Sequence, residues 1–275
     1  MDTCHGDNLS KLLFEKQLGL IMDSEIKIIS KHSSSVPKIT VVVPVKDEED
    51  SIQLLIQEIC DVLRGVETFE IIYIDDGSID GTQGKLRVLM GEVPELISFR
   101  HVTSCGQSSA IVTGVKNARG SIIVTLDGDG QNDPRDILNL LSQYSNTKKP
   151  GEVLVIGHRV KRMDSIIKSW SSYFANSFRK SLLGDKVPDT GCGLKVFSKS
   201  MFLEFPVFDH MHRFMPALTN RIGGEVISVP VNHRTRKSGN SKYGTWYRLF
   251  AGIVDILGVI WLKKRGSLPQ VIPIE

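Results

Sequence analysis

Short runs of β-branched residues alternate with longer helical patterns from Lys38 onward, and this alternation restricts the fold more than any other feature of the sequence. The pattern predicts strands at 39–45, 70–74, 97–101, 121–126 and 152–157, with helices between them at 51–66, 81–91, 107–119 and from Pro134 to about 145. Strands separated by helices are typical of a parallel sheet with helices on its faces. We therefore expect an α/β fold with a Rossmann-like, mostly parallel sheet flanked by helices.

The regions around this pattern differ from it in character. Residues 1–36 hold one weakly amphipathic run and end in a serine-rich linker, which indicates an accessory arm. The main domain is expected to cover 37–245 and to include a long helix at 163–183. A terminal segment, 246–275, contains an apolar run of fourteen residues from Leu249 to Leu262. The chain is thus predicted to consist of an arm, one main domain and a short apolar segment.

The terminal apolar run is short for a membrane-spanning helix. As a helix it would measure roughly 21 Å, against a hydrocarbon core of about 30 Å. Basic and aromatic side chains flank it, namely Trp246, Tyr247, Arg248, Trp261, Lys263, Lys264 and Arg265. This arrangement favours an amphipathic helix lying on a membrane surface. The alternative is a helix at a subunit interface, which would make the chain a homo-oligomer.

Charge is distributed unevenly along the 275 residues. Up to residue 150 there are 15 basic and 22 acidic residues, a net charge of −7, and after it 19 and 9, a net charge of +10. A basic half indicates an anionic partner such as a phosphorylated ligand or a membrane surface. The cysteines at 4, 60, 105 and 192 are scattered, which fits a reduced compartment, and the first eight residues are not typical of a secretory signal. We expect a cytoplasmic location.

The strongest local signal follows the predicted strand at 121–126. Asp127 and Asp129 stand one residue apart there, and Gly128 and Gly130 allow the chain to turn so that both carboxylates reach one hard divalent cation. Gln131 adds a neutral oxygen. Because ligands bind at the carboxyl ends of strands in open α/β sheets, the pattern predicts Mg²⁺ or Mn²⁺ on a diphosphate. The alternative, a plain Asp-Gly turn, requires neither two acids nor the glutamine.

Two further strands end in polar residues at the same predicted edge. The run at 70–74 leads into Asp75 and Asp76, and Asp76 could accept hydrogen bonds from a base or ribose. The run at 39–45 leads into Asp47 and Glu48. Three strand ends are therefore expected to meet in one crevice.

Other ligand sites are not indicated by the sequence. No G-x-G-x-x-G follows a strand, and Gly84-Lys85 lacks the rest of a phosphate-binding P-loop. The histidines form no H-x-x-x-H pair and the cysteines no C-x-x-C pair, so no zinc site is predicted. The basic residues of the second half lack the interleaved aromatics of a nucleic-acid surface, and we expect no nucleic-acid partner.

Taken together, the motifs resemble those of the family 2 glycosyltransferases of GT-A fold, over residues 38 to about 245. Residues 44–48 (P-V-K-D-E) resemble the family's P-x-Y-N-E, with Lys46 and Asp47 departing from it, residues 75–82 resemble D-D-G-S-x-D-G-T, and 127–129 resemble D-x-D. Residues 157–159 (G-H-R) resemble the family's segment whose arginine meets phosphate. Residues 189–193 resemble the family's D-x-x-S-G-F, and residues 236–242 resemble its R-x-x-G-x-S-K. The resemblance is to the polyprenyl-phosphate glycosyltransferases within that family.

The resemblance implies roles for individual residues. Nucleotide contacts would come from Pro44, Glu48, Ile74, Asp76, Asp127, Gly128, Arg236 and Lys242. Metal ligands for Mg²⁺ or Mn²⁺ would be Asp127, Asp129 and Gln131. Asp189 would act as a base or position the acceptor, and Arg159 would meet phosphate. Arg162 is added as a second phosphate ligand on its charge and proximity. Arg236 and Lys242, in a Gly-Ser loop, could neutralise a leaving diphosphate.

The same resemblance implies inverting transfer of a sugar from a UDP- or GDP-linked donor to a polyprenyl phosphate. The protein would act peripherally on the cytoplasmic face of the inner membrane and make a lipid-linked sugar for cell-envelope lipopolysaccharide. One alternative keeps the fold and transfers the sugar to a hydroxyl of a glycan or lipid A, which would require a true base. The other is a nucleotide-sugar-binding membrane scaffold without turnover.

Overall fold

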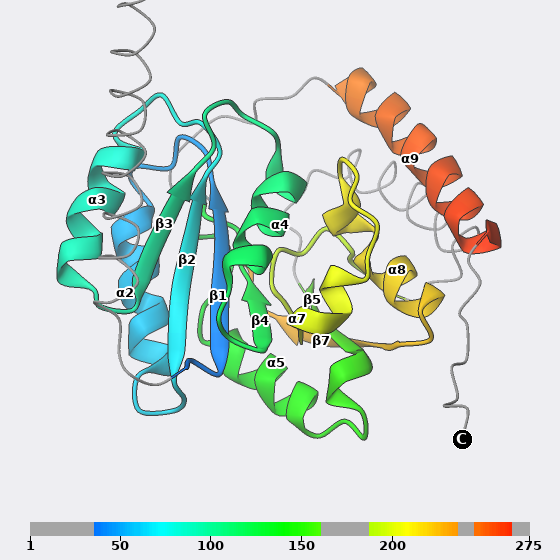
Figure 1. The fold of residues 1–275 in the computed structure, drawn as a ribbon, viewed down its shortest axis with the longest axis horizontal. Helices are drawn as coiled ribbons and strands as arrows, with labels where there is room; N and C mark the ends of the chain where they lie inside the picture. Colours follow the sequence, from blue (N-terminus) through cyan, green and yellow to red (C-terminus); the bar gives the residue numbers. More distant parts are fainter. Residues whose placement is uncertain (1–35, 161–186, 236–244, 266–275) are drawn as a thin grey trace, which may run out of the picture. The chain divides into compact units, whose positions relative to one another are not determined.

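The computed structural model describes residues 36–160, 187–235 and 245–265. They contain a seven-stranded sheet in the order β3-β2-β1-β4-β6-β5-β7 (Figure 1). The strands are β1 (Ile39–Val45), β2 (Phe69–Asp75), β3 (Leu96–Arg100), β4 (Ile122–Thr125), β5 (Val153–Arg159), β6 (Lys195–Ser198) and β7 (Glu225–Val231). Strand β6 runs antiparallel to both of its neighbours, and every other pairing is parallel. The expected mostly parallel α/β sheet is confirmed.

Helices cover both faces of the sheet. The described helices are α2 (Ile52–Leu63), α3 (Thr82–Glu92), α4 (Gln107–Asn117), α5 (Asp136–Ser145), α7 (Lys199–Leu203), α8 (Met215–Arg221) and α9 (Thr245–Arg265), with short 3-10 turns at Pro150–Glu152 and Met211–Arg213. Buried residues of α2, α3 and α5 share one apolar cluster with the sheet, and those of α4, α7 and α8 share another. The helix expected at 163–183 lies outside the described residues.

Strand β1 shows why the sequence produces this layering. Its seven residues, I-T-V-V-V-P-V, are all buried. Val41 and Val43 face the cluster of α2 and α3, whereas Val42 faces that of α4, because successive side chains of a strand point to opposite faces. A continuous β-branched run therefore suits a central strand that is covered on both sides.

The sheet topology brings the polar segments together. Since β1, β2, β4, β5 and β7 run in the same direction, their carboxyl ends lie at one edge of the sheet, and the antiparallel β6 begins at that edge. The loops that follow β1, β2 and β4 carry the acids singled out in the sequence. The 189–194 segment reaches the same edge because it leads into β6.

A buried polar network closes the opposite edge. The Glu70 carboxylate accepts hydrogen bonds from Thr40 Oγ1 (2.7 Å), Arg119 N (2.6 Å) and Arg119 Nε (2.7 Å), and Glu70 is 1% exposed. Gly120 N donates to Thr40 Oγ1 at 3.0 Å. These contacts attach the α4–β4 connection to β1 and β2.

Replacing Glu70 with alanine should lower the free energy of unfolding by about 3 kcal/mol, because the change leaves buried donors of Thr40 and Arg119 without their acceptor. Urea denaturation followed by circular dichroism measures the change. Glu67→Ala is the matched control, since Glu67 pairs with Lys38 at an exposed position, and it should stay within about 0.5 kcal/mol of the parent. Equal losses for the two variants would contradict a special role for Glu70.

Helix α9 packs against α8 through one of its faces. Val259 is fully buried with Phe214 and Ala217, and Ile256 and Ile260 pack beside them. His210 Nδ1 pairs with Asp255 Oδ2 at 3.0 Å, and Arg221 Nε donates to the Leu262 carbonyl at 3.2 Å. Among the described residues, no helix combines the length and apolarity needed to cross a bilayer.

Candidate active site

The loop after β4 carries the acidic pair and is held tightly against β1. A Cβ at Gly128 would lie 2.2 Å from Val45 Cγ1, so only glycine fits at this position. Ser51 Oγ donates to the Gly128 carbonyl at 2.7 Å. This close approach fixes the backbone between Asp127 and Asp129.

Asp127 lies where three segments of the chain meet. Gln107 Nε2, from the first turn of α4, donates to Asp127 Oδ1 at 2.8 Å, and the Asp127 N–H donates to Asn132 Oδ1 at 3.1 Å. A Cβ at Gly193 would lie 2.3 Å from the Asp127 carboxylate, so the segment before β6 passes directly beside it. Burial and the negative charge of Asp129 raise the pKa of Asp127 to about 6, against the opposing effects of Lys195 and Arg159.

The chemistry of this loop fits a hard divalent cation. Burial is the largest cause of the raised pKa of Asp127 and the negative charge of Asp129 the next, and a cation between the two carboxylates would relieve their repulsion. Gln131 N donates to Asp129 Oδ1 at 3.1 Å, which brings the third predicted ligand back toward the acids. Two carboxylates and an amide oxygen are typical ligands of Mg²⁺ or Mn²⁺. The three residues remain the proposed metal ligands.

Arg159 and Asp189 form a two-pronged ion pair beside this loop. Arg159 Nε donates to Asp189 Oδ2 at 2.6 Å and Nη2 donates to Oδ1 at 2.9 Å. The side chains are 19% and 9% exposed. Although burial opposes it, the contact with Asp189 raises the pKa of Arg159, so the guanidinium stays charged. Within the described residues, the side-chain hydrogen bonds to Asp189 use Nε and Nη2 of Arg159 and not Nη1.

Lys195 is 2% exposed and lies near enough to Asp127 to oppose the rise of that carboxyl's pKa. Its Nζ donates to the carbonyl of Cys192, and Thr125 Oγ1 donates to the carbonyl of Gly193 at 2.6 Å. Burial lowers the pKa of Lys195, while the neighbouring Cys192, Asp127 and Asp189 oppose that change. The hydrogen bond from Lys195 to the Cys192 carbonyl helps to hold the segment before β6 in place.

Asp76 is occupied by contacts within the chain. Its carboxylate oxygens accept hydrogen bonds from His101 Nδ1 (2.7 Å), Ser104 Oγ (2.7 Å), Cys105 N (2.8 Å) and Gly106 N (2.8 Å). Despite its burial, these hydrogen bonds hold the pKa of Asp76 below its ordinary value. Gly106 has a φ of 88°, a left-handed conformation that suits glycine. A nucleoside would contact the Asp76 carboxylate only by replacing one of these donors.

The other residues that were predicted to contact the nucleotide differ in how deeply they are buried. The side chain of Ile74 is fully buried in the apolar cluster of α4, and the contact of this residue with a nucleoside stays a prediction. Pro44 is buried within β1 and pairs with Ile74. Glu48 is partly exposed, and its N–H donates to Thr82 Oγ1 at 3.0 Å. Arg162, Arg236 and Lys242 lie outside the described residues.

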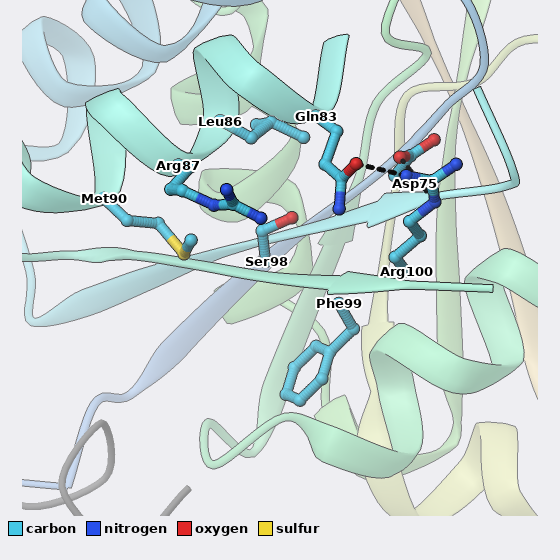
Figure 2. Close-up of a pocket in the computed structure, with 8 residues that line it drawn as sticks. All are labelled: Asp75, Gln83, Leu86, Arg87, Met90, Ser98, Phe99 and Arg100. Atoms are coloured by element: carbon cyan, nitrogen blue, oxygen red, sulfur yellow. Dashed lines mark hydrogen bonds and ion pairs between the residues drawn. The ribbon is translucent and has the colours of Figure 1, made fainter. Parts of the chain in front are cut away.

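A small pocket lies on the outer side of this region, between α3 and β3 (Figure 2). Its volume is about 110 Å³, far below the roughly 300 Å³ or more of a typical ligand pocket. Arg100 lies 3.6 Å from the buried Asp75 carboxylate and donates to the Ser78 carbonyl at 2.9 Å. The pocket therefore belongs to the packing that fixes the loop after β2, and we do not assign the nucleotide to it.

Four residues that shape the site were given no role of their own in the sequence analysis. They are Gln107, Asn132, Gly193 and Lys195. Gln107 and Asn132 contact Asp127 by hydrogen bonds, Gly193 makes room for it, and Lys195 lies near it. Asn132 is near enough in sequence to have been included with the acidic loop. The other three come from distant segments, and only the fold brings them to Asp127.

The sequence of this chain is similar to those of known proteins. A family model described as "Glycosyl transferase family 2" matches residues 40–205, more than half of the chain. The chain is 32% identical over 243 residues to the dodecaprenyl-phosphate galacturonate synthase of Rhizobium johnstonii, covering 84% of this chain and 69% of the relative. It is 29% identical over 225 residues to the undecaprenyl-phosphate 4-deoxy-4-formamido-L-arabinose transferase of Photorhabdus laumondii, covering 81% and 67%. The chain thus spans about two thirds of these relatives.

Solved structures share the fold at low identity. Mannosyl-3-phosphoglycerate synthase from Rubrobacter xylanophilus has a TM-score of 0.61 at 15% identity, over 86% of this chain and 77% of that one. The mannosyltransferase PcManGT from Pyrobaculum calidifontis, in complex with GDP-Man and Mn²⁺, has a TM-score of 0.58 at 19% identity, over 95% and 77%. These similarities support the arrangement of the sheet and helices described above.

Proposed function

The chain belongs to glycosyl transferase family 2, and from that premise we propose that it moves a sugar from a nucleotide diphosphate sugar to a polyprenyl phosphate, with inversion. It is a glycosyltransferase related to the polyprenyl-phosphate sugar transferases, and its fold is of the GT-A type. The proposal rests on two groups of opposite charge that lie at the same edge of the sheet. One is the acidic loop of Asp127 and Asp129, and the other is the Arg159 guanidinium held by Asp189.

The acidic loop is assigned to the donor. Asp127, Asp129 and Gln131 would hold Mg²⁺ or Mn²⁺, and the bound ion would supply charge stabilisation for the departing nucleotide diphosphate. The protein prepares this site beforehand, because Gln107 and Asn132 orient Asp127, and Ser51 fixes the loop backbone at Gly128. Preorganised groups cost no rearrangement during the reaction.

Arg159 is assigned to the acceptor phosphate. Asp189 uses the Nε and Nη2 nitrogens of Arg159, so the guanidinium is fixed in orientation and presents Nη1 to an anion. A lipid phosphate is already ionised near neutral pH and needs no base to remove a proton. Asp189 therefore serves the reaction as a positioning residue for Arg159. Arg162, Arg236 and Lys242 remain proposed phosphate ligands from the sequence.

The proposed acceptor class is supported by the names of the relatives, and the UDP- or GDP-linked donor is the one that the sequence motifs led us to expect. The relatives' names specify dodecaprenyl- and undecaprenyl-phosphate and different sugars, galacturonate and formamido-arabinose. We therefore propose a polyprenyl phosphate acceptor and a UDP- or GDP-linked donor, with the product serving as a lipid-linked sugar for cell-envelope or lipopolysaccharide glycosylation. The sugar itself is left to the experiment below.

The direct test combines purified protein, Mg²⁺ or Mn²⁺, undecaprenyl phosphate and a panel of UDP- and GDP-sugars, with glycolipid detected by chromatography and mass spectrometry. We expect one donor to yield a metal-dependent product that carries the sugar on phosphate. Metal-dependent donor binding without any lipid product would instead favour the hydroxyl acceptor of a glycan or lipid A. Donor binding with no product on any acceptor would favour a non-catalytic scaffold.

Helix α9 is assigned to docking on the cytoplasmic face of the inner membrane. Val254, Leu257 and Trp261 form an exposed apolar stripe on α9 and are 54%, 61% and 60% exposed. The last turn of α9 carries the basic residues Lys263, Lys264 and Arg265. An exposed apolar stripe next to basic residues suits the surface of an anionic bilayer. A homo-oligomer formed through the same stripe is the competing use of α9.

The double substitution Leu257→Ser with Trp261→Ser should weaken binding to vesicles of phosphatidylglycerol by about tenfold or more, because two apolar side chains lose their burial in the lipid interface. Co-sedimentation measures the bound fraction, and added salt should lower it. The control is Leu203→Ser with Val207→Ser, which removes apolar side chains of 50% and 62% exposure away from α9. Unchanged vesicle binding with a changed oligomeric state would assign the stripe to a subunit interface.

A further inference from the structure

Arg234 joins three parts of the chain that are far apart in sequence. It lies three residues after β7, and its Nη1 pairs with both oxygens of Glu58 in α2, at 2.9 and 2.7 Å. Its Nη2 lies 3.0 Å from Asp133 Oδ1, in the loop after β4. Arg234 thus connects the end of β7 to α2 and to the acidic loop.

The backbone of Arg234 also contacts a proposed metal ligand. Its N–H donates to the Gln131 carbonyl at 2.9 Å, and its carbonyl accepts a hydrogen bond from Gln131 Nε2 at 3.3 Å. The neighbouring residues Asn132 and His233 form an antiparallel bridge. Gln131 is therefore held at both its backbone and its side chain by one short segment after β7.

The contact with Gln131 Nε2 determines how the amide is used. An amide nitrogen only donates and an amide oxygen only accepts. Since the nitrogen is bound to the Arg234 carbonyl, the oxygen is the end of Gln131 that remains for a cation. The amide is thus held in the one orientation that suits a metal ligand.

The Arg234 guanidinium stabilises this arrangement through its ion pair with Asp133. Asp133 is 2% exposed and lies two residues beyond Gln131. Two guanidiniums contact Asp133, those of Arg135 and Arg234, but the Arg135 side chain is 77% exposed and makes no described contact with Gln131. Among the residues that the structure describes, Arg234 alone links the Asp133 charge to the backbone that holds Gln131.

We infer that Arg234 is a positioning residue for the metal site, which acts by orienting the Gln131 amide oxygen toward the cation. The inference rests on the proposed function, because it takes Asp127, Asp129 and Gln131 as the metal ligands. Residues that orient metal ligands typically contribute about 10- to 100-fold to metal affinity. The side chain of Arg234 itself lies behind the ligands and contacts the carboxylates of Glu58 and Asp133.

The test measures Mn²⁺ affinity of the full chain by electron paramagnetic resonance, with Mn²⁺ alone and with UDP or GDP. Arg234→Gln should weaken Mn²⁺ binding by about tenfold. Arg234→Lys should recover only part of the loss, since an ammonium cannot pair with two carboxylates in the same fork. Arg135→Gln is the matched control, because it removes the other partner of Asp133, and its Mn²⁺ affinity should equal that of the parent.

A double-mutant cycle separates positioning from a general structural effect. Gln131→Ala alone should weaken Mn²⁺ binding, and adding Arg234→Gln should cause little further loss if Arg234 acts through Gln131. Additive losses, or equal losses for Arg135→Gln, would overturn the inference. If Arg234→Gln does not fold, Glu58→Gln removes its anchor in α2 and should produce a smaller loss in the same direction, and an unchanged affinity there would also overturn it.

The outcomes also separate this inference from the proposed function. Absence of Mn²⁺ binding by the unmodified protein would reject the proposed metal site, and this inference with it. Mn²⁺ binding that depends on Gln131 but not on Arg234 would reject the role of Arg234 alone.

Discussion

Asp129→Asn should reduce sugar transfer by about 1,000-fold or more and abolish metal-dependent donor binding, with little change in the fold. The reason is that Asp129 supplies one of the two carboxylates of the proposed metal site, and removing its charge leaves the departing diphosphate without much of its stabilisation. Asp129 is also partly exposed, and among the described residues its carboxylate accepts a hydrogen bond from Gln131 N, which an asparagine oxygen can still accept. Initial rates with the donor that the panel of UDP- and GDP-sugars selects measure the effect.

Two controls make this result specific to the metal site. Asp61→Asn removes an acidic side chain from α2, where its carboxylate accepts a hydrogen bond from Gln57 at 2.7 Å, and it should leave the rate unchanged. Circular dichroism and thermal unfolding should be unchanged for both variants. An Asp129→Asn protein that retains Mn²⁺ affinity and most of its transfer rate would show that the acidic loop is only a turn.

Asp189→Asn should lower kcat/KM for the lipid phosphate by about 100-fold while donor and metal affinities remain unchanged. The Asp189 carboxylate holds Arg159 by two hydrogen bonds, and a neutral amide cannot accept both in the same way. Arg159 would then lose the orientation in which it meets the acceptor phosphate. Because no proton is removed in this scheme, the pH dependence of the rate should keep its shape.

The pH profile distinguishes positioning from base catalysis. If the acceptor is a hydroxyl and Asp189 is the base, Asp189→Asn should abolish the rate and remove the acid limb of the profile. Arg159→Lys provides a second comparison, since the lysine retains the charge but not the paired geometry. Arg159→Lys and Asp189→Asn should be strongly non-additive when combined, because the two side chains act as one unit. Independent, additive effects would contradict the pairing described here.

Much of the fold followed from patterns of adjacent residues. The β-branched run of β1 and the alternation after it predicted a mostly parallel sheet, and the loops after β1, β2 and β4 were expected at one edge. These predictions succeed because side-chain periodicity is a local property and a helix between two strands typically makes those strands parallel. The antiparallel direction of β6 was not predicted, since it depends on how the chain returns to the sheet between β4 and β5.

The nucleoside contacts of Ile74 and Asp76 stay predictions, and the structure shows what surrounds each residue. Both residues lie at the end of β2, where the pattern places them near a ligand. The structure buries Ile74 against α4 and surrounds Asp76 with donors from 101–106. A motif indicates at which end of a strand a ligand is expected to bind, whereas the side chains of other segments determine which atoms remain exposed there.

The sequence by itself determined the class of fold, the acidic loop at 127–131 and the resemblance to family 2 glycosyltransferases, because each depends on residues close together in the chain. Only the tertiary structure decided which partners those residues have. Arg159 meets Asp189 across 30 positions, Gln107 meets Asp127 across 20, and Arg234 meets Glu58 across 176. Such contacts arise because packing the sheet against its helices brings distant segments together. A pattern of adjacent residues does not specify which distant segments will meet.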